Sequence, residues 1–426
     1  MVECGWAGAR KPLSLRAFVQ AVALWRVERD AKAKGRGTTI LGMGRARTYL
    51  DTAASAPLRR EALEAIQRAQ TTLHGNPSSP HAEGRAAKDA LEEARTRVAT
   101  ALGCRPREVV FTGSGTEAAN LGVRGGALAR AGVGRRVVVS AVEHPCVLEA
   151  ARTLVPAGFE VSVVGVDAQG CVDPAAFVEA AGADTALACL MLANHETGNV
   201  LPVAQVAEGL RARRIPLLVD ASLAFGRLAV KPAELGADLL VVSGHKLGGP
   251  KGSGALIVRR PTRVLPLQVG GLQEERLRPG TEDVAAALGL AAALETCQRE
   301  QADDARRLVA GMEVFLGALE SLSGWRRLGD PLRALPGLVT LELDGVEGEA
   351  VMIHMDLAGF AVATGSTCAL GGTEVSPSLL AMGLSARRAA STIRVSPSPT
   401  ASDAALVEAA HALSTAVERL RSLARR

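Results

Sequence analysis

From residue 48 onward, short runs rich in Val, Leu and Ile alternate with Ala/Leu-rich segments of helical period. Several of the short runs are apolar at every position, which is typical of strands buried on both faces of a mostly parallel sheet. The segments 87–102 and 203–214 are long enough to be the helices that connect parallel strands. The pattern therefore predicts an α/β fold with a mostly parallel central sheet and helices on both faces. The expected strands are 108–111, 136–140, 161–166, 186–192, 217–220, 239–242 and 255–258.

The length predicts more than one domain, because 426 residues exceed the ~150 residues of a typical domain. We expect a large α/β domain over 48–303 and a smaller C-terminal α+β domain over 304–426. An Ala-rich helix over 284–308 would connect the two, and a helix over 402–424 would end the chain. The first residues of the large domain are expected to pack on the small one.

Residues 1–47 differ from the rest of the chain in charge. The whole chain has a net charge of +5, but residues 1–47 carry an excess of seven positive charges and the remainder is slightly acidic. We interpret residues 1–47 as a disordered basic extension or as sequence upstream of a true start at Met43; a mitochondrial-type presequence is the alternative.

Charge and hydropathy exclude two classes of partner. Aromatic residues are only 3% of the chain, so no basic stacking surface for nucleic acid is expected. No apolar run approaches the ~18 residues of a membrane-spanning helix, so no membrane insertion is expected.

The seven cysteines are an odd, scattered set without a Cys-x-x-Cys pair. This pattern argues against a disulfide framework or a structural zinc, so no metal site is expected, and it favours a reducing compartment such as the bacterial cytoplasm. Six of them lie in or beside apolar or helical sequence. Cys368 lies in the Gly/Ser/Thr-rich segment 363–372, which would leave its thiol exposed and reactive.

A lysine and an aspartate follow two of the expected strands. Lys246 comes just after the strand 239–242, where burial would lower the pKa of its amine toward the range in which it attacks carbonyl groups. Asp220 ends the strand 217–220, and a carboxylate at that depth needs a cationic partner. Taken singly, Lys246 is also compatible with a glycine-rich surface turn, and Asp220 with capping a following helix.

Two further polar motifs follow strands of the same sheet. Gly115 and Thr116 lie in a glycine-bearing turn between the strand 108–111 and a helical run, a geometry that holds phosphate groups. His144 follows the strand 136–140, where an imidazole can stack on a flat ring or move a proton. Each of these two motifs, taken alone, is also compatible with a purely structural role.

The joint occurrence of these motifs outweighs the separate structural readings. The carboxyl ends of parallel strands meet at one edge of a sheet, so a phosphate cradle, a carboxylate, a lysine and an imidazole would converge there. These are the parts of a pyridoxal phosphate site, in which the lysine forms a Schiff base and the aspartate keeps the ring nitrogen protonated. Arg394, inside Ile/Val sequence, needs an anionic partner, either the carboxylate of an amino-acid substrate or an internal acid.

From residue 49 to about 396 the sequence resembles the cysteine desulfurases, pyridoxal phosphate enzymes of the class V, fold-type I family, and specifically their branch with a long cysteine loop. The spacings between the shared motifs follow that family without gaps from Thr116 to Cys368. The motifs are Tyr49-Leu50-Asp51, Asn76-Pro77-Ser78-Ser79, Gly115-Thr116-Glu117, Glu143-His144, Asn194-His195-Glu196-Thr197-Gly198, Asp220-Ala221, Ser243-x-His245-Lys246, Arg278-x-Gly280-Thr281 and Gly365-Ser366-x-Cys368.

The resemblance implies a role for each matching residue. Lys246 would bind pyridoxal phosphate covalently and later move the substrate's Cα proton, Asp220 would pair with its ring nitrogen, and His144 would stack on its ring. Arg394 would hold the carboxylate of L-cysteine, with Asn194 and His195 beside the substrate, and the Cys368 thiolate would take the sulfur as a persulfide. Residues implied to hold the phosphate are Gly115, Thr116, Ser243, His245 and, from a second subunit, Thr281.

The resemblance also implies partners. A phosphate contact from a second subunit requires a homodimer, and the persulfide sulfur would pass to an acceptor or scaffold protein for iron–sulfur cluster assembly or thiolation. Selenocysteine lyase is an alternative with the same set of residues, and a catalytically degenerate cofactor-binding scaffold is another.

Four positions depart from the family. His195 stands where a second Asn usually contacts the cofactor's phenolic oxygen and the substrate, and Leu223 stands where a Gln commonly donates to that oxygen. We hypothesise that His195 supplies the missing donor and thereby recovers about 1 kcal/mol. Glu275-Arg276 replaces an Arg-Gly pair, and residues 396–399, Ser-Pro-Ser-Pro, replace a segment that contains Gly-Arg.

Overall fold

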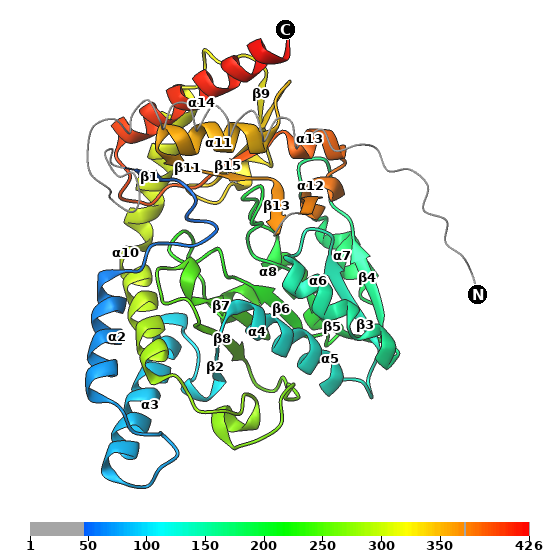
Figure 1. Ribbon diagram of the computed structural model, residues 1–426. Helices are drawn as coiled ribbons and strands as arrows, with labels where there is room; N and C mark the ends of the chain where they lie inside the picture. Colours follow the sequence, from blue (N-terminus) through cyan, green and yellow to red (C-terminus); the bar gives the residue numbers. More distant parts are fainter. Residues whose placement is uncertain (1–46, 370–371, 426) are drawn as a thin grey trace, which may run out of the picture. The chain divides into compact units, whose positions relative to one another are not determined.

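The structure is a computed structural model that describes residues 47–369 and 372–425, with the backbone alone described for 366–369 and 372–374. The expectations for residues 1–46 lie outside the described residues. Arg47–Arg426 form one compact unit. Within it, helix α10 (Val284–Gly317) runs from the region of a large sheet to the region of a small one (Figure 1).

The large sheet has seven strands in the order β2-β8-β7-β6-β5-β3-β4. The pairs from β7 to β4 are parallel, and only β8 runs against its two neighbours. The predicted mostly parallel sheet is thus confirmed, with each expected strand found within a few residues of its predicted bounds. The strands are β2 (Val109–Thr112), β3 (Arg136–Ser140), β4 (Glu160–Val164), β5 (Thr185–Cys189), β6 (Leu217–Asp220), β7 (Leu239–Ser243) and β8 (Gly254–Val258).

Both faces of this sheet are buried, which explains why its strands lack an alternating polar pattern. In β6, Leu217 and Val219 belong to one hydrophobic cluster while Leu218 belongs to the other, on the opposite face. One face packs against helices that include α3 (Ala82–Leu102) and α8 (Val203–Ala212), and the other against helices that include α4 and α6. Further helices of this part are α2 (Arg60–Thr72), α4 (Gly115–Asn120), α5 (Gly126–Ala129), α6 (Pro145–Arg152), α7 (Pro174–Ala180) and α9 (Pro232–Leu235).

The small sheet is antiparallel, with the strand order β12-β15-β10-β9. Its four strands are β9 (Trp325–Leu328), β10 (Val339–Leu343), β12 (Ala363–Thr364) and β15 (Thr392–Val395). Helices α11 (Gly348–Ala358) and α14 (Asp403–Ala424) cover it at the end of the molecule that holds the C-terminus (Figure 1). The expected C-terminal α+β part and its last helix are therefore confirmed; the short helices α12 (Pro377–Ala381) and α13 (Ala386–Ala390) complete it.

The connecting helix is longer than predicted. It ends at Gly317 rather than at 308, because its second half buries Met312 and Phe315 against the small sheet. The predicted domain boundary after residue 303 falls inside this helix and stays a prediction. No helix of the described residues is long and apolar enough to cross a membrane.

The first described residues, 47–53, pair with segments of the C-terminal part of the chain before α2 begins. Strand β1 (Thr48–Tyr49) pairs in parallel with β11 (Phe360–Ala361), and Asp51 forms a bridge with Ser396. The Thr52 hydroxyl donates to the main-chain oxygen of Ser396 at 2.9 Å, and the Ala53 N–H donates to the Ser396 hydroxyl at 3.0 Å. Segment 50–53 is thereby fixed at the junction of the two sheets.

Candidate active site

Two side chains of opposite charge lie at the same edge of the large sheet. Asp220 is the last residue of β6, and Lys246 ends the 3-10 helix η4 (Gly244–Lys246) that directly follows β7. Strands β6 and β7 are parallel neighbours, with Asp220 in register with Val241. The predicted meeting of these two strand ends is therefore observed. Asp220 also accepts the N–H of Ser222 at 2.9 Å, so its carboxylate shapes the turn as well.

Lys246 is half-buried and its Nζ donates a hydrogen bond to the main-chain oxygen of Ala53. Burial, followed by the positive charge of Arg394, lowers the pKa of Lys246 to about 8, against the opposing charges of Asp220 and Asp51. Compared with an ordinary lysine, a far larger fraction of this amine is unprotonated near neutral pH. An unprotonated amine is the nucleophile that condenses with an aldehyde.

The turn after β2 brings a helix start against two serine hydroxyls. Gly115 and Thr116 are the first residues of α4. A Cβ on Gly115 would lie 2.7 Å from the Cβ of Ser243 and 3.4 Å from the hydroxyl oxygen of Ser222, so only glycine allows this close approach. Main-chain N–H groups and hydroxyls gathered in one place are donors suited to a phosphate. The predicted grouping of Gly115 with Ser243 is thus present, and Ser222 joins it.

His245 lies between this cradle and Lys246 in the chain. Burial, together with the positive charges of Lys246 and Lys251, lowers the pKa of His245 to about 4. The imidazole is therefore neutral near pH 7 and can donate one hydrogen bond.

His144 precedes α6 and caps it. Its Nδ1 accepts the N–H of Cys146 at 3.1 Å, and the Cys146 Sγ lies 3.0 Å from the same nitrogen. Burial lowers the pKa of His144, with the Lys246 charge acting in the same direction and Asp220 opposing it. Because Nδ1 is an acceptor and the ring is neutral, the proton sits on Nε2.

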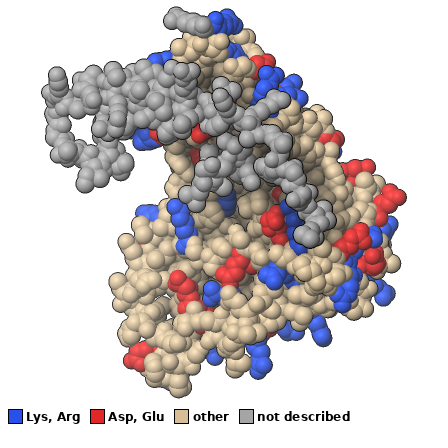
Figure 2. All heavy atoms as spheres, turned by 45° about the vertical axis from the view of Figure 1, so that its right-hand side comes forward, with Lys and Arg blue, Asp and Glu red and all other residues tan. Residues whose placement is uncertain are grey.

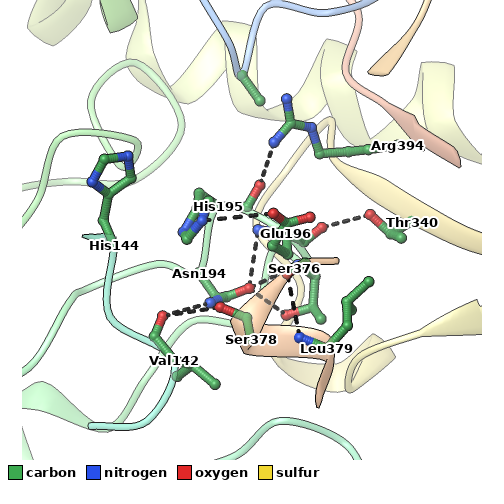
Figure 3. Close-up of polar contacts among 12 residues, drawn as sticks. Val142, His144, Asn194, His195, Glu196, Thr340, Ser376, Ser378, Leu379 and Arg394 are labelled. Atoms are coloured by element: carbon green, nitrogen blue, oxygen red, sulfur yellow. Dashed lines mark hydrogen bonds and ion pairs between the residues drawn. The ribbon is translucent and has the colours of Figure 1, made fainter. Parts of the chain in front are cut away.

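The loop after β5 carries the second histidine of the site. The ring centroids of His144 and His195 are 5.2 Å apart at an interplanar angle of 63° (Figure 3). Burial, then the charges of His144, Arg394 and Lys246, lowers the pKa of His195 well below its ordinary value. Its Nε2 lies 3.7 Å from Oε1 of Glu196.

Asn194 uses its amide to shape this loop. Its Nδ2 donates to the main-chain oxygen of Val142 at 3.1 Å, and its Oδ1 accepts the N–H groups of Glu196 and Thr197 at 3.0 and 2.8 Å. These bonds hold the His195 ring in place. The substrate contact predicted for Asn194 stays a prediction.

The segment that contains Cys368 is attached to the same loop. It was expected to be an exposed loop, but it includes two antiparallel strands, β13 (Ser366–Ala369) and β14 (Gly372–Val375), with Cys368 opposite Thr373. The side chain of Cys368 lies outside the described residues. After β14, Ser376 hydrogen bonds through its side chain to the buried Glu196 carboxyl (Figure 3). The base of this hairpin is therefore fixed to the loop of His195.

Arg394, on β15, contacts one internal acid and one main-chain oxygen. Its Nη2 forms an ion pair with Asp51 at 2.9 Å, and its Nη1 donates to the main-chain oxygen of His195 at 2.7 Å. Its Nε is buried and has no hydrogen-bond partner among the residues that the structure describes. The internal acid anticipated as an alternative is thus Asp51, and binding of a substrate carboxylate stays a prediction.

Four buried polar atoms of this site have no hydrogen-bond partner among the described residues. They are Oε2 of Glu143, Nδ1 of His195, Oε2 of Glu196 and Nε of Arg394. Buried polar atoms are normally satisfied, so these four, beside a nucleophilic lysine and a phosphate cradle, indicate a polar ligand. The residues present therefore fit pyridoxal phosphate and an amino acid.

Two further positions that the sequence singled out differ from this polar cluster in their surroundings. Thr281 is exposed on the loop before α10. Leu223 is buried in a small apolar cluster with Ala53, Ala193, Leu335 and Leu338.

Sequence reasoning missed several charged groups of the site. In the sequence, Asp51 and Glu196 stood out only as parts of family motifs, and no motif included Arg227. Each acts through contacts with residues far away in the chain, which no local pattern shows. Arg227, a charge inside the apolar run 223–230, is the one of the three that local sequence could have signalled.

On the lower part of the molecule, basic and acidic side chains are interspersed over the described surface (Figure 2). This agrees with the small net charge expected for the chain beyond residue 47.

A protein-family model described as aminotransferase class-V matches residues 48–405. Among curated proteins, a cysteine desulfurase IscS of Dictyoglomus turgidum is 38% identical over 81% of this chain and 88% of its own length. An IscS-like cysteine desulfurase of Mycobacterium tuberculosis is 38% identical over 88% of this chain and 98% of its own.

Solved structures show the same fold. A NifS-like protein covers 88% of this chain and 99% of its own with a TM-score of 0.80 and 27% identity. SspA, solved in complex with cysteine, covers 83% of this chain and 99% of its own with a TM-score of 0.72 and 30% identity. Both likenesses extend across the two sheets.

Proposed function

Because the chain belongs to the class-V aminotransferase family, we propose that it is a cysteine desulfurase, an enzyme that converts L-cysteine to L-alanine and keeps the sulfur as a persulfide on Cys368. The observation that carries the proposal is the half-buried Lys246 amine, of lowered pKa, at the strand end next to Asp220. The likeness to SspA, whose structure holds cysteine, supports the choice of substrate.

The cofactor of this family is pyridoxal phosphate, and the site has a residue for each of its polar groups. Lys246 would hold it through Nζ, and Asp220 would pair with the ring nitrogen. The helix start at Gly115 and the Ser243 hydroxyl would hold the phosphate, with His144 against the ring. When bound, the cofactor would supply an electron-accepting ring that acidifies the Cα–H of an attached amino acid.

The chain's own residues would then perform the transfer. Arg394 would bind the substrate carboxylate through its unpartnered Nε and its fork, and the freed Lys246 amine would move the Cα proton. The Cys368 thiolate would attack the substrate sulfur, so that an S–S bond forms and the substrate's C–S bond breaks. L-Cysteine and the Cys368 thiol thus yield L-alanine and the Cys368 persulfide, with all atoms accounted for.

The proposal includes a second copy of the chain. The loop before α10 exposes Val269 to 95% and Leu272 to 68%, an apolar surface that a homodimer would cover. Thr281 lies on the same loop and would reach the phosphate of the partner's site.

We also propose that the sulfur passes to an acceptor or scaffold protein for iron–sulfur cluster assembly or thiolation, in the bacterial cytoplasm. The curated relatives above are bacterial desulfurases, and the cysteines of the described residues are free thiols, as a reducing compartment favours.

The decisive experiment measures alanine release and enzyme-bound persulfide after adding L-cysteine to the purified protein, with selenocysteine as a comparison substrate. The wild type should bind pyridoxal phosphate, release alanine and carry a persulfide. Cys368→Ala should keep the visible absorption of the bound cofactor and form no persulfide. A wild-type protein that binds the cofactor but forms neither alanine nor persulfide would overturn the proposal in favour of a scaffold role.

A further inference from the structure

Arg227 is a buried guanidinium that ties three segments together at the junction of the two sheets. It lies seven residues after Asp220 and is 8% exposed. Its Nη1 donates to the main-chain oxygens of Pro336 and Gly337 at 2.6 and 2.9 Å, and its Nη2 donates to the Thr52 hydroxyl at 2.8 Å. All three acceptors are uncharged.

Arg227 therefore carries a positive charge that no carboxylate balances directly, since none of the ion pairs among the described residues includes it. Burial, followed by the charge of Arg394, lowers the pKa of Arg227 to about 10, which leaves it protonated near pH 7. Burying an unpaired charge costs stability, and neutral donors would satisfy the same oxygens. The hydrogen bonds alone do not account for a guanidinium at this position.

The charge acts on Lys246. Arg227 is one of the cations that lower the pKa of the Lys246 amine, beside the larger effects of burial and Arg394. The charged and titratable groups that face Lys246 are Asp220 at the end of β6, Asp51 in the N-terminal segment, Arg394 on β15, Arg227 after β6, and the imidazoles of His144, His195 and His245. The three imidazoles are neutral at pH 7, so two guanidinium cations and two carboxylates face the Lys246 amine, and one of those cations, Arg394, is already paired with Asp51.

The hydrogen bonds of Arg227 act on the same amine. Thr52, which accepts from Arg227, directly precedes Ala53, whose main-chain oxygen accepts from Lys246 Nζ. A shift of the guanidinium would therefore move the acceptor of the lysine.

We propose that Arg227 is a positioning residue, whose charge increases the unprotonated, nucleophilic fraction of the Lys246 amine and whose hydrogen bonds hold segment 52–53 at that amine. The inference rests on the proposed function only in assigning the reactive amine to Lys246. It concerns the cofactor-free protein as much as the loaded enzyme.

The test is the titration of Lys246 in the cofactor-free protein, followed by NMR after selective ¹³C labelling of lysine. The chain has seven lysines, and the Lys246 signal is identified by its loss in Lys246→Ala. Arg227→Gln should raise the pKa of Lys246, by less than the loss of the larger Arg394 effect would, because a nearby positive charge is removed. It should also slow the association of pyridoxal phosphate at neutral pH.

Arg421→Gln is the matched control. Arg421 also donates to three main-chain oxygens, those of Ser323, Gly324 and Asp344, but it lies on α14 away from the site. It should leave the Lys246 titration and the rate of cofactor association unchanged.

Two further variants distinguish the effect of the Arg227 charge from an effect of altered structure. They also keep the inference testable if Arg227→Gln does not fold. Arg227→Lys keeps the charge and should leave the Lys246 titration close to that of the wild type. Asp51→Asn removes an opposing charge and should lower the pKa of Lys246 further.

An unchanged Lys246 titration in Arg227→Gln, or an equal rise in Arg227→Lys, would overturn the inference. Neither result bears on cysteine turnover by the wild type, so failure of this inference and failure of the proposed function are separately visible.

Discussion

At the scale of single residues, His195 and Leu223 are the two departures that lie closest to the proposed cofactor. Leu223 offers no hydrogen bond and is 7% exposed within an apolar cluster. His195 offers a buried Nδ1 without a partner. Because an unmade buried hydrogen bond costs about 1–3 kcal/mol, a ligand atom is the expected partner of this nitrogen.

We predict that His195→Asn shifts the pH titration of the visible absorption of bound pyridoxal phosphate. Burial lowers the pKa of His195 well below its ordinary value, so its imidazole is uncharged near neutral pH and the shift reports a lost or altered hydrogen bond to the cofactor's phenolic oxygen. The absorption spectrum recorded across pH measures it.

His411→Asn is the control for this titration, since His411 is exposed on α14. It should leave the spectrum unchanged at every pH. If His195→Asn titrates like the wild type, the imidazole does not contact the phenolic oxygen and Leu223 has no compensating donor.

The burial of Glu143 predicts a measurable effect on how the free energy of unfolding depends on pH. Its Oε1 accepts the Ser140 hydroxyl and the Met191 N–H, both at 2.7 Å, while burial raises its pKa to about 8. The folded protein then binds one proton more than the unfolded chain between pH 4.5, the ordinary value, and about 8. Within that window the free energy of unfolding should fall as pH rises, by up to about 1.4 kcal/mol per pH unit from this group.

Glu143→Gln should remove this contribution, because the amide is neutral at every pH and retains an oxygen for the two donors. Urea unfolding of both proteins between about pH 5 and about pH 8 measures the slopes. Glu149→Gln, an exposed substitution on α6, should keep the wild-type slope. Parallel slopes for wild type and Glu143→Gln would mean that Glu143 is ionised in the folded state.

At the scale of elements, the turn at 273–276 combines strain with a buried anchor. Glu274, Glu275 and Arg276 have φ values of 48°, 52° and 69°, in the left-handed region. The Glu274 carboxylate is held by both Nη atoms of Arg95, at 2.6 and 2.8 Å, and by the N–H of Phe111 at 2.7 Å. This ion pair keeps the turn in an unfavourable backbone conformation just before the loop that carries Thr281.

Arg276→Gly should stabilise the protein by about 0.5–1 kcal/mol, because glycine adopts a positive φ without the steric cost that arginine has there. The urea midpoint should rise accordingly. Arg263→Gly is the matched control: Arg263 is exposed on a neighbouring loop without a positive φ, so the same substitution should give no gain. A lower midpoint for Arg276→Gly would show that the arginine side chain stabilises the turn by more than its backbone strain.

Comparing the expected with the observed strands shows which elements a sequence pattern can predict. The bounds of β3 and β6 were predicted to the residue, because apolar runs buried on both faces stand out from polar flanks. The hairpin at Cys368 was not predicted, because its Gly/Ser/Thr composition lacks a hydrophobic pattern. The strained turn was not predicted either, because only the distant Arg95 explains how non-glycine residues can stay in that conformation.

At the scale of the whole molecule, the site is assembled from segments that are far apart in the chain. The strand-end rule predicted that Asp220, Lys246, Gly115 and His144 meet, since all four follow strands of one sheet. It said nothing about Asp51, which pairs with Arg394 across 343 positions. Such contacts depend on how the small sheet docks on the large one, and sequence periodicity does not determine that arrangement.

The proposed homodimer predicts that two inactive variants restore each other. If Thr281 acts in the partner's site, a heterodimer of Lys246→Ala and Thr281→Ala subunits has one site with both residues intact. Unfolding and refolding an equal mixture should then recover roughly a quarter of wild-type alanine release, since about half of the randomly paired dimers are mixed and each has one working site.

Mixing Lys246→Ala with Asp220→Ala is the matched control for this recovery. These two residues belong to the site of one subunit, so every mixed dimer keeps two damaged sites and no activity should return. Recovery in the first mixture and not in the second assigns Thr281 to the partner's site. Equal recovery in both mixtures, or none in either while a sedimentation measurement shows mixed dimers, would contradict a contact in trans and return Thr281 to its own subunit.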